Sequence, residues 1–108
     1  MRKWKNRDEF KKEVKKFADK IDVKVKSMKF RLMKNKWASC STKGNLNFNL
    51  NLLKMDKSAG KYVIIHELLH FRVPNHGKLW KSLMRVYLGN IEKKRIILEK
   101  QGFMYEYK

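Results

Sequence analysis

The three histidines of this chain of 108 residues, His66, His70 and His76, all lie in the segment HELLHFRVPNH, residues 66 to 76. On an α-helix, which turns about 100° per residue, positions 66 and 70 share one face about one turn apart, as two ligands of one metal ion require. Pro74 interrupts the helical pattern, so the chain turns and His76 is expected to approach from the following helix. Three neutral imidazoles leave the fourth position of a tetrahedral Zn²⁺ for water, which is the arrangement of a catalytic zinc site.

Glu67 follows the first histidine and lies about 100° from it around the helix, within reach of a water bound to the zinc. A carboxylate in that place serves as a general base. Zinc lowers the pKa of its water to about 7, Glu67 takes the proton, and the hydroxide attacks a carbonyl that the metal polarises. Glu67 then returns the proton to the leaving amine. These roles predict a zinc-dependent metallopeptidase that acts on peptide or unfolded-protein substrates.

The alternative is that the histidines are ordinary core residues, because the same segment carries four large apolar side chains: Ile64, Ile65, Leu68 and Leu69. Two imidazoles and a carboxylate without partners are expensive to bury in such surroundings. The third histidine at short range and the helical context favour the metal site.

A helical stripe and three period-two patterns predict the elements before this segment. Phe10, Val14, Phe17 and Ile21 recur at i, i+4, i+7 and i+11, which predicts an amphipathic helix that Asp8 would cap. A bulged strand is expected over residues 23–32, with its phase shift near Ser27, and a short strand over residues 37–41. Residues 42–44 form a hairpin turn, and NLNFNLNL, residues 45–52, alternates four apolar residues with four asparagines as a half-buried strand does.

Three helices are predicted to follow. The first opens at Asp56 and runs through Phe71; Asn75 is expected to cap the second, which ends at Gly89. The apolar stripe of that second helix consists of Leu79, Trp80, Leu83, Met84, Tyr87 and Leu88. A last helix spans residues 91–100 and ends at Gly102. The order is helix, three short strands and three helices, so residues 1–108 are predicted to form a single domain of the α+β class.

The chain carries a net charge of +18, with 22 Lys among its 28 basic residues. A nucleic-acid partner is one interpretation of this charge, and a solvated Lys-rich surface is the other. Readers of specific DNA sequences rely on Arg, and the six Arg here are thinly spread, so the second interpretation is favoured. No apolar run approaches the length of a membrane span. The single Cys40 and the absence of a signal-peptide pattern predict a cytoplasmic protein.

The stretches WASCSTKGNLNFNLNLL and VIIHELLHFRVPNHGKLW resemble the YgjP-like and minigluzincin metallopeptidases, which are small zincins with a histidine as third ligand. The resemblance implies a minimal zincin fold, with His66, His70 and His76 as zinc ligands and Glu67 as base. It also implies that residues 37–41 form the sheet edge beside the zinc. An extended substrate can pair with such an edge through its main chain, where Ala38, Ser39 and Cys40 are small enough to let it approach.

Two further hypotheses concern the tail and the function. The aromatic segment GFMYEYK, from Gly102 to the end, is expected either to occupy the cleft and keep the enzyme latent or to pack ordinarily against the domain. The rival functions are a DNA-associated protease similar to SprT-like enzymes and a zinc-stabilised binding module without catalysis. No residue is assigned to stabilise the oxyanion. Arg72, Tyr87 and Tyr105 are candidates for that role, and each is also a candidate for a purely structural one.

Overall fold

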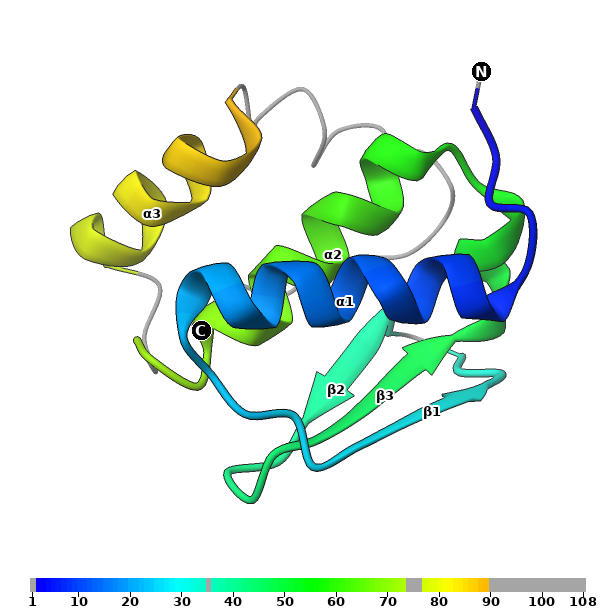
Figure 1. Cartoon of the computed structure of the whole chain (residues 1–108), viewed down its shortest axis with the longest axis horizontal. Helices are drawn as coiled ribbons and strands as arrows, with labels where there is room; N and C mark the ends of the chain where they lie inside the picture. Colours follow the sequence, from blue (N-terminus) through cyan, green and yellow to red (C-terminus); the bar gives the residue numbers. More distant parts are fainter. Residues whose placement is uncertain (1, 35, 74–76, 90–108) are drawn as a thin grey trace.

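The computed structural model describes residues 2–34, 36–73 and 77–89 (Figure 1). These residues form a three-stranded sheet and helices that lie above it in the view of Figure 1. In chain order the elements are α1 (Arg7–Ile21), β1 (Ser27–Arg31), β2 (Ala38–Cys40), β3 (Asn45–Asn49), the 3₁₀ helix η1 (Leu50–Lys54), α2 (Lys57–Leu69) and α3 (Lys78–Leu88). The predicted α+β class is confirmed.

The first helix has the predicted stripe but a different cap. Phe10, Val14 and Phe17 are buried along one face of α1. The N-cap is Asn6, whose backbone is extended and whose side-chain oxygen accepts a hydrogen bond from the Glu9 amide at 3.0 Å. The prediction of Asp8 as the cap was wrong, because Asp8 already lies in the first turn, where a carboxylate still interacts favourably with the helix dipole.

The sheet has the order β1-β3-β2, with β1 parallel to β3 and β2 antiparallel to it. The β2–β3 hairpin turns where it was predicted, with Gly44 at φ 94°, in a region that favours glycine. The predicted bulged strand over residues 23–32 is wrong, because only Ser27–Arg31 pair with β3. Val23 and Val25 instead belong to the exit from α1 and pack half-buried against the core, whereas Leu32 is 74% exposed.

The alternating segment at residues 45–52 is a strand only as far as Asn49. The Asn49 side chain donates to the carbonyls of Met33 and Lys36, both at 2.9 Å, and accepts a hydrogen bond from the Asn51 amide. Asn49 is therefore fully buried and caps η1, which begins at the next residue. The chain leaves the sheet here because an asparagine side chain satisfies local backbone groups in place of a neighbouring strand.

One face of the sheet contacts the helices through aromatic side chains. The Phe10 ring of α1 packs 5.4 Å from Phe30 of β1 and 5.0 Å from Phe48 of β3, measured between ring centroids. On the same face of β3, Leu46 is 1% exposed. The core thus lies between this face of the sheet and the helices α1 and α2.

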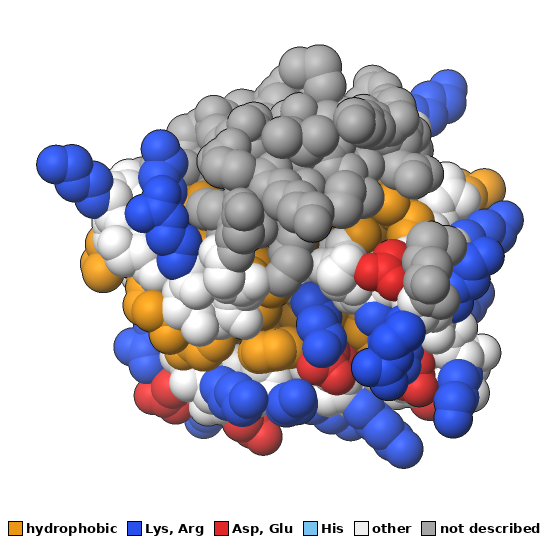
Figure 2. All heavy atoms as spheres, turned by 90° about the horizontal axis from the view of Figure 1, so that it is seen from above, with side chains coloured by type: hydrophobic (Ala, Val, Ile, Leu, Met, Phe, Trp, Pro, Cys, Tyr) orange, Lys and Arg blue, Asp and Glu red, His pale blue; other side chains and the backbone are white. Residues whose placement is uncertain are grey.

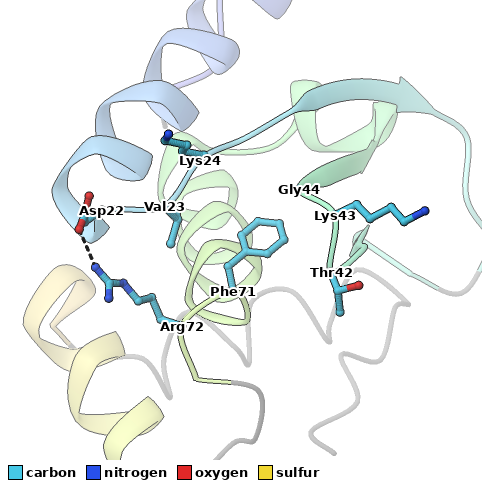
Figure 3. Close-up of a pocket in the computed structure, with 8 residues that line it drawn as sticks. All are labelled: Asp22, Val23, Lys24, Thr42, Lys43, Gly44, Phe71 and Arg72. Atoms are coloured by element: carbon cyan, nitrogen blue, oxygen red, sulfur yellow. Dashed lines mark hydrogen bonds and ion pairs between the residues drawn. The ribbon is translucent and has the colours of Figure 1, made fainter.

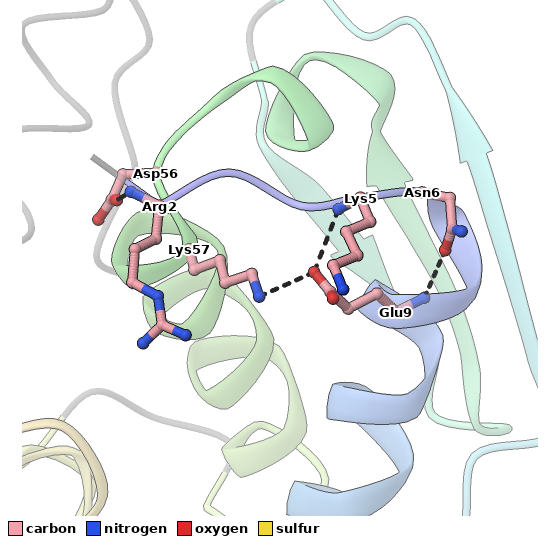
Figure 4. Close-up of polar contacts among 6 residues, drawn as sticks. All are labelled: Arg2, Lys5, Asn6, Glu9, Asp56 and Lys57. Atoms are coloured by element: carbon pink, nitrogen blue, oxygen red, sulfur yellow. Dashed lines mark hydrogen bonds and ion pairs between the residues drawn. The ribbon is translucent and has the colours of Figure 1, made fainter.

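The N-terminal residues cross the start of α2 and connect it to α1 (Figure 4). Lys3 forms an isolated bridge with Asp56, and the Arg2 amide donates to an Asp56 carboxylate oxygen at 2.8 Å. The Glu9 carboxylate lies 2.9 Å from the Lys57 ammonium, which holds the pKa of that carboxyl below its ordinary value. We call residues 2–5 the N-terminal strap.

The helix α2 begins as predicted, with Asp56 as its N-cap, but ends at Leu69, before Phe71. The helix α3 begins after Gly77, which is its N-cap residue. Its predicted stripe holds for Trp80, Met84 and Leu88, whereas Leu79 is 62% exposed. The predicted cap Asn75, the helix at residues 91–100 and the tail from Gly102 lie outside the described residues. Within the described ranges, no helix is long and apolar enough to span a membrane.

Candidate active site

The helix α2 carries the two histidines and the glutamate that the sequence singled out. His66 and Glu67 are 1% and 4% exposed, and His70 is half-buried at the end of the helix. The atoms that these three side chains offer to a metal all lie within 4.8 Å of one another. The fold therefore brings His66, Glu67 and His70 together, and His76 lies outside the described residues.

The two imidazole rings meet edge to face, with centroids 4.8 Å apart and an interplanar angle of 74°. Trp80 of α3 lies against both of them: its ring is 5.0 Å from that of His66 and stacks at 6.3 Å on that of His70. Tyr62, one turn earlier on α2, lies 6.0 Å from His66. Large aromatic surfaces thus hold the imidazoles in place within the core.

Trp80 had been predicted only as part of an apolar helical stripe. Nothing in its spacing indicated that it would contact the histidines, because that contact depends on how α3 crosses α2. The pairing of a tryptophan with two candidate ligands is a tertiary feature that the sequence pattern did not reveal.

The donor set suits a divalent metal ion of the kind that imidazole nitrogen and carboxylate oxygen bind. The Nδ1 atom of His66 lies 3.4 Å from Oε1 of Glu67. Glu67 therefore lies beside the candidate ligands.

The edge strand β2 contributes Cys40 to the surroundings of Glu67. Burial first, and then the adjacent Glu67 carboxylate, raises the pKa of the Cys40 thiol to about 12. The residue remains a protonated thiol at neutral pH, so it is unsuited to act as a thiolate nucleophile. The sequence had suggested Cys40 for contact with substrate and did not reveal its contact with Glu67.

The strand β2 pairs with β3 on one side only, and no described strand pairs with its other side. The hydrogen bonds from Asn49 to Trp37 and from Ser41 to Asn45 show that the odd-numbered residues of this strand bond to β3. By the alternation of an antiparallel ladder, the main-chain groups of Ala38 and Cys40 point to the open edge, and those of Ser39 point to β3.

Two of the side chains considered as stabilisers of the oxyanion form hydrogen bonds to the end of α1 instead. Arg72 donates to Asp22 at 2.9 Å and to the Ile21 carbonyl at 3.1 Å, and the Tyr87 hydroxyl donates to the Lys20 carbonyl at 3.5 Å. Both residues therefore connect the second half of the chain to the end of α1. Tyr105 lies outside the described residues.

A pocket of about 390 Å³ lies beside this Arg72 contact, between the end of α1, the β2–β3 turn and the end of α2 (Figure 3). It is lined by Asp22, Val23, Lys24, Thr42, Lys43, Gly44, Phe71 and Arg72. The Arg72 side chain is directed to Asp22, and neither histidine of α2 lines the pocket. This pocket is therefore separate from the group of candidate ligands.

Comparison with known proteins places these features in a family. The family model described as "YgjP-like, metallopeptidase domain" matches residues 1–101. The crystal structure of the metallopeptidase zymogen of Methanocaldococcus jannaschii jannalysin is similar, with a TM-score of 0.72 and 28% identity over 86% of this chain and 94% of that one. The zymogen of Pyrococcus abyssi abylysin shares the fold, with a TM-score of 0.70 and 20% identity over 89% of this chain and 99% of that one. No curated protein matches the sequence.

Proposed function

The chain belongs to the YgjP-like metallopeptidase family, and we propose that it hydrolyses peptide bonds of extended or unfolded substrates with Zn²⁺ held by His66, His70 and His76. The observation that carries the proposal is the convergence of the His66, Glu67 and His70 side chains within 4.8 Å on a buried helix, beside an open sheet edge. Two imidazoles one helical turn apart are a donor pair that suits zinc, and a third completes the set. When bound, Zn²⁺ supplies a Lewis acid that polarises the scissile carbonyl and lowers the pKa of water at the site.

Glu67 is the proposed general base. Its carboxylate accepts a proton from the attacking water and later delivers this proton to the amine that leaves. Burial between α2 and the sheet fixes the side chain and keeps bulk water from it, so that its orientation does not have to be established at each turnover. The uncharged thiol of Cys40 is a polar neighbour of the Glu67 carboxylate.

The proposed substrate site is the open edge of β2. An extended peptide pairs with the outward main-chain groups of Ala38 and Cys40, as an added strand does. The side chain of Ser39 projects to the opposite face of the sheet from those two. The strand is only three residues long, so we expect it to contact few substrate side chains. The enzyme should therefore have only a weak preference for substrate sequence.

Latency is a second part of the proposal. The two solved structures reported above are described as zymogens, and we infer that the tail of this chain from Gly102 onward restrains its activity. A chain ending at Lys100 is expected to cleave casein faster than the full chain. Equal or lower activity of the shortened chain, at equal metal content, would count against latency.

The proposal also covers where the enzyme acts and what it binds. A single cysteine agrees with a reducing compartment, so we place the enzyme in the cytoplasm. Its partners are peptide or unfolded-protein substrates.

The function is tested by elemental analysis and by cleavage of casein with the wild type, with Glu67→Gln and with Glu13→Gln. The last variant makes the same chemical change on α1, away from the site. One zinc in all three proteins, with cleavage lost by about 10² to 10⁴ in Glu67→Gln alone, is the expected result. Undiminished cleavage by Glu67→Gln would refute its role as base. Zinc in all proteins with no cleavage by any, even after removal of the tail, would favour the binding module.

A further inference from the structure

The sheet region of the chain carries positive charge and no negative charge. Residues 23 to 55 contain eight Lys or Arg and neither Asp nor Glu. On α1, by contrast, Asp8, Glu9, Glu13 and Asp19 lie among the basic residues. Figure 2 shows the helix side of the molecule, where acidic side chains lie among the Lys and Arg side chains. The absence of acidic residues distinguishes this segment from α1.

The register of the strands sorts the side chains of the sheet onto two faces. Met28 and Phe30 of β1 share the helix-covered face with their partners Leu46 and Phe48 of β3. Ser27, Lys29 and Arg31 alternate with them and therefore lie on the opposite face. Apart from Asn49, which is buried and bonds to the loop after β1, the side chains on that face, which we call the open face, are Ser27, Lys29, Arg31, Asn45, Asn47 and Ser39. The helices of the described residues, 2–34, 36–73 and 77–89, lie on the other side of the sheet (Figure 1).

The open face is polar and cationic. Lys29 and Arg31 are exposed, and the Asn and Ser side chains beside them are half-buried. The loop that the buried Asn49 holds at one end of this face adds exposed Lys34 and Lys36. Alternate residues of a strand are about 6.6 Å apart, so Lys29 and Arg31 form a pair of neighbouring cations on β1. No aromatic residue occupies the strand positions of this face, so it offers nothing on which a base could stack.

We propose that the open face binds nucleic acid through the phosphate backbone, without reading sequence. Four exposed cations without an acid, Lys29 and Arg31 on β1 and Lys34 and Lys36 on the adjoining loop, suit the phosphate backbone, which binds by counterion release and needs no base contacts. A protein partner fits less well, because protein interfaces are poor in Lys and rich in aromatic residues. A membrane surface fits less well too, because the strands present no apolar side chains for insertion on this face.

The open face and the histidine group lie on opposite sides of the sheet, since α2 packs on the covered face. Nucleic acid bound there leaves His66, Glu67 and the edge of β2 uncovered. The binding is therefore independent of the proposed peptidase reaction, and it would keep the enzyme near proteins that are themselves bound to nucleic acid.

The test is fluorescence anisotropy of a labelled oligonucleotide, single-stranded and duplex, titrated with the full chain at salt concentrations from about 50 to about 200 mM. Two double variants are compared, Lys29→Gln/Arg31→Gln on the open face and Lys12→Gln/Lys15→Gln on the exposed side of α1. Each has a net charge of +16, two below that of the wild type. Any difference between them therefore reports the location of the charge. Glu67→Gln is included, and casein cleavage by both double variants is measured.

The wild type and Glu67→Gln are expected to bind alike, with affinity that falls steeply as salt rises. The open-face variant should bind more weakly, with a log-log salt slope shallower by about 1.8 on duplex, because each lost phosphate contact removes about 0.9. The α1 variant should retain the wild-type slope, and casein cleavage should be unchanged in both. Equal losses in the two double variants, or no binding at low salt, would overturn the proposal. Displacement of the oligonucleotide by polyglutamate at matched charge concentration would overturn nucleic acid as the partner. These outcomes do not depend on whether casein is cleaved.

Discussion

The contact between Gly60 and the N-terminal strap yields a sharp stability prediction. Gly60 lies inside α2, where alanine is normally better than glycine by about 1 kcal/mol. A Cβ added at this position would lie 2.7 Å from Cζ2 and 2.8 Å from Nε1 of the Trp4 ring. The ring cannot move aside freely, because it is 7% exposed and is held between Phe10, at 4.8 Å, and the Lys57 ammonium, at 5.6 Å.

Overpacking of this kind costs about 1–3 kcal/mol, which exceeds the helical gain. We therefore expect Gly60→Ala to lower the free energy of unfolding by about 1 kcal/mol, or about 4 to 8 °C in Tm. The effect should change sign when Trp4 is first replaced by Leu, which lacks the contacting ring atoms. In that background, Gly60→Ala should stabilise the protein by up to about 1 kcal/mol.

The measurement is urea denaturation of the four proteins of this cycle, followed by circular dichroism. A rise in stability on Gly60→Ala in the wild-type background would refute the reasoning. So would an identical effect in both backgrounds, because the contact with Trp4 would then play no part.

Three further predictions concern single side chains. Asn6→Ala should destabilise the protein by about 1 kcal/mol in urea denaturation, whereas Asp8→Ala should cost clearly less, because only Asn6 caps α1. Asn49→Ala leaves two loop carbonyls without their donor and should lower the free energy of unfolding by about 2–3 kcal/mol. Amide exchange over residues 33–36 should become faster. An unchanged exchange rate would contradict the role given to this side chain. The folded state raises the pKa of Cys40 from 9.0 to about 12, so the stability that this thiol contributes is fully present below pH 9 and is lost as pH rises towards 12. The fall in stability over that range should be less steep in Cys40→Ala than in the wild type.

The parts of the fold that follow local periodicity could be predicted from the sequence. Phe10, Val14 and Phe17 define α1, and the spacing of His66 and His70 predicted that both would lie on one helical face. Prediction failed where tertiary hydrogen bonds outweigh the pattern. The alternation from residue 45 to 52 continues unbroken, yet the chain leaves the sheet at Asn49, because this side chain bonds to a loop more than ten residues earlier.

The surroundings of the candidate site were harder to predict than its centre. The contact of Trp80 with both imidazoles and that of Cys40 with Glu67 join segments far apart in the sequence. No spacing rule predicts such contacts, since they depend on how α3 and β2 pack against α2. The sequence therefore predicted that His66 and His70 would lie together, and the structure added the residues that pack around them.

The open edge of β2 also bears on self-association. A strand edge that no described strand covers can pair with the same edge of another copy, which is how sheet proteins aggregate, so the edge proposed to bind substrates is also a site of possible aggregation. Here the exposed strand spans three residues, too few for a stable ladder between copies. The charge of +18 adds mutual repulsion, which weakens as salt rises. Solubility of this protein should therefore depend on ionic strength, with low salt keeping the copies apart.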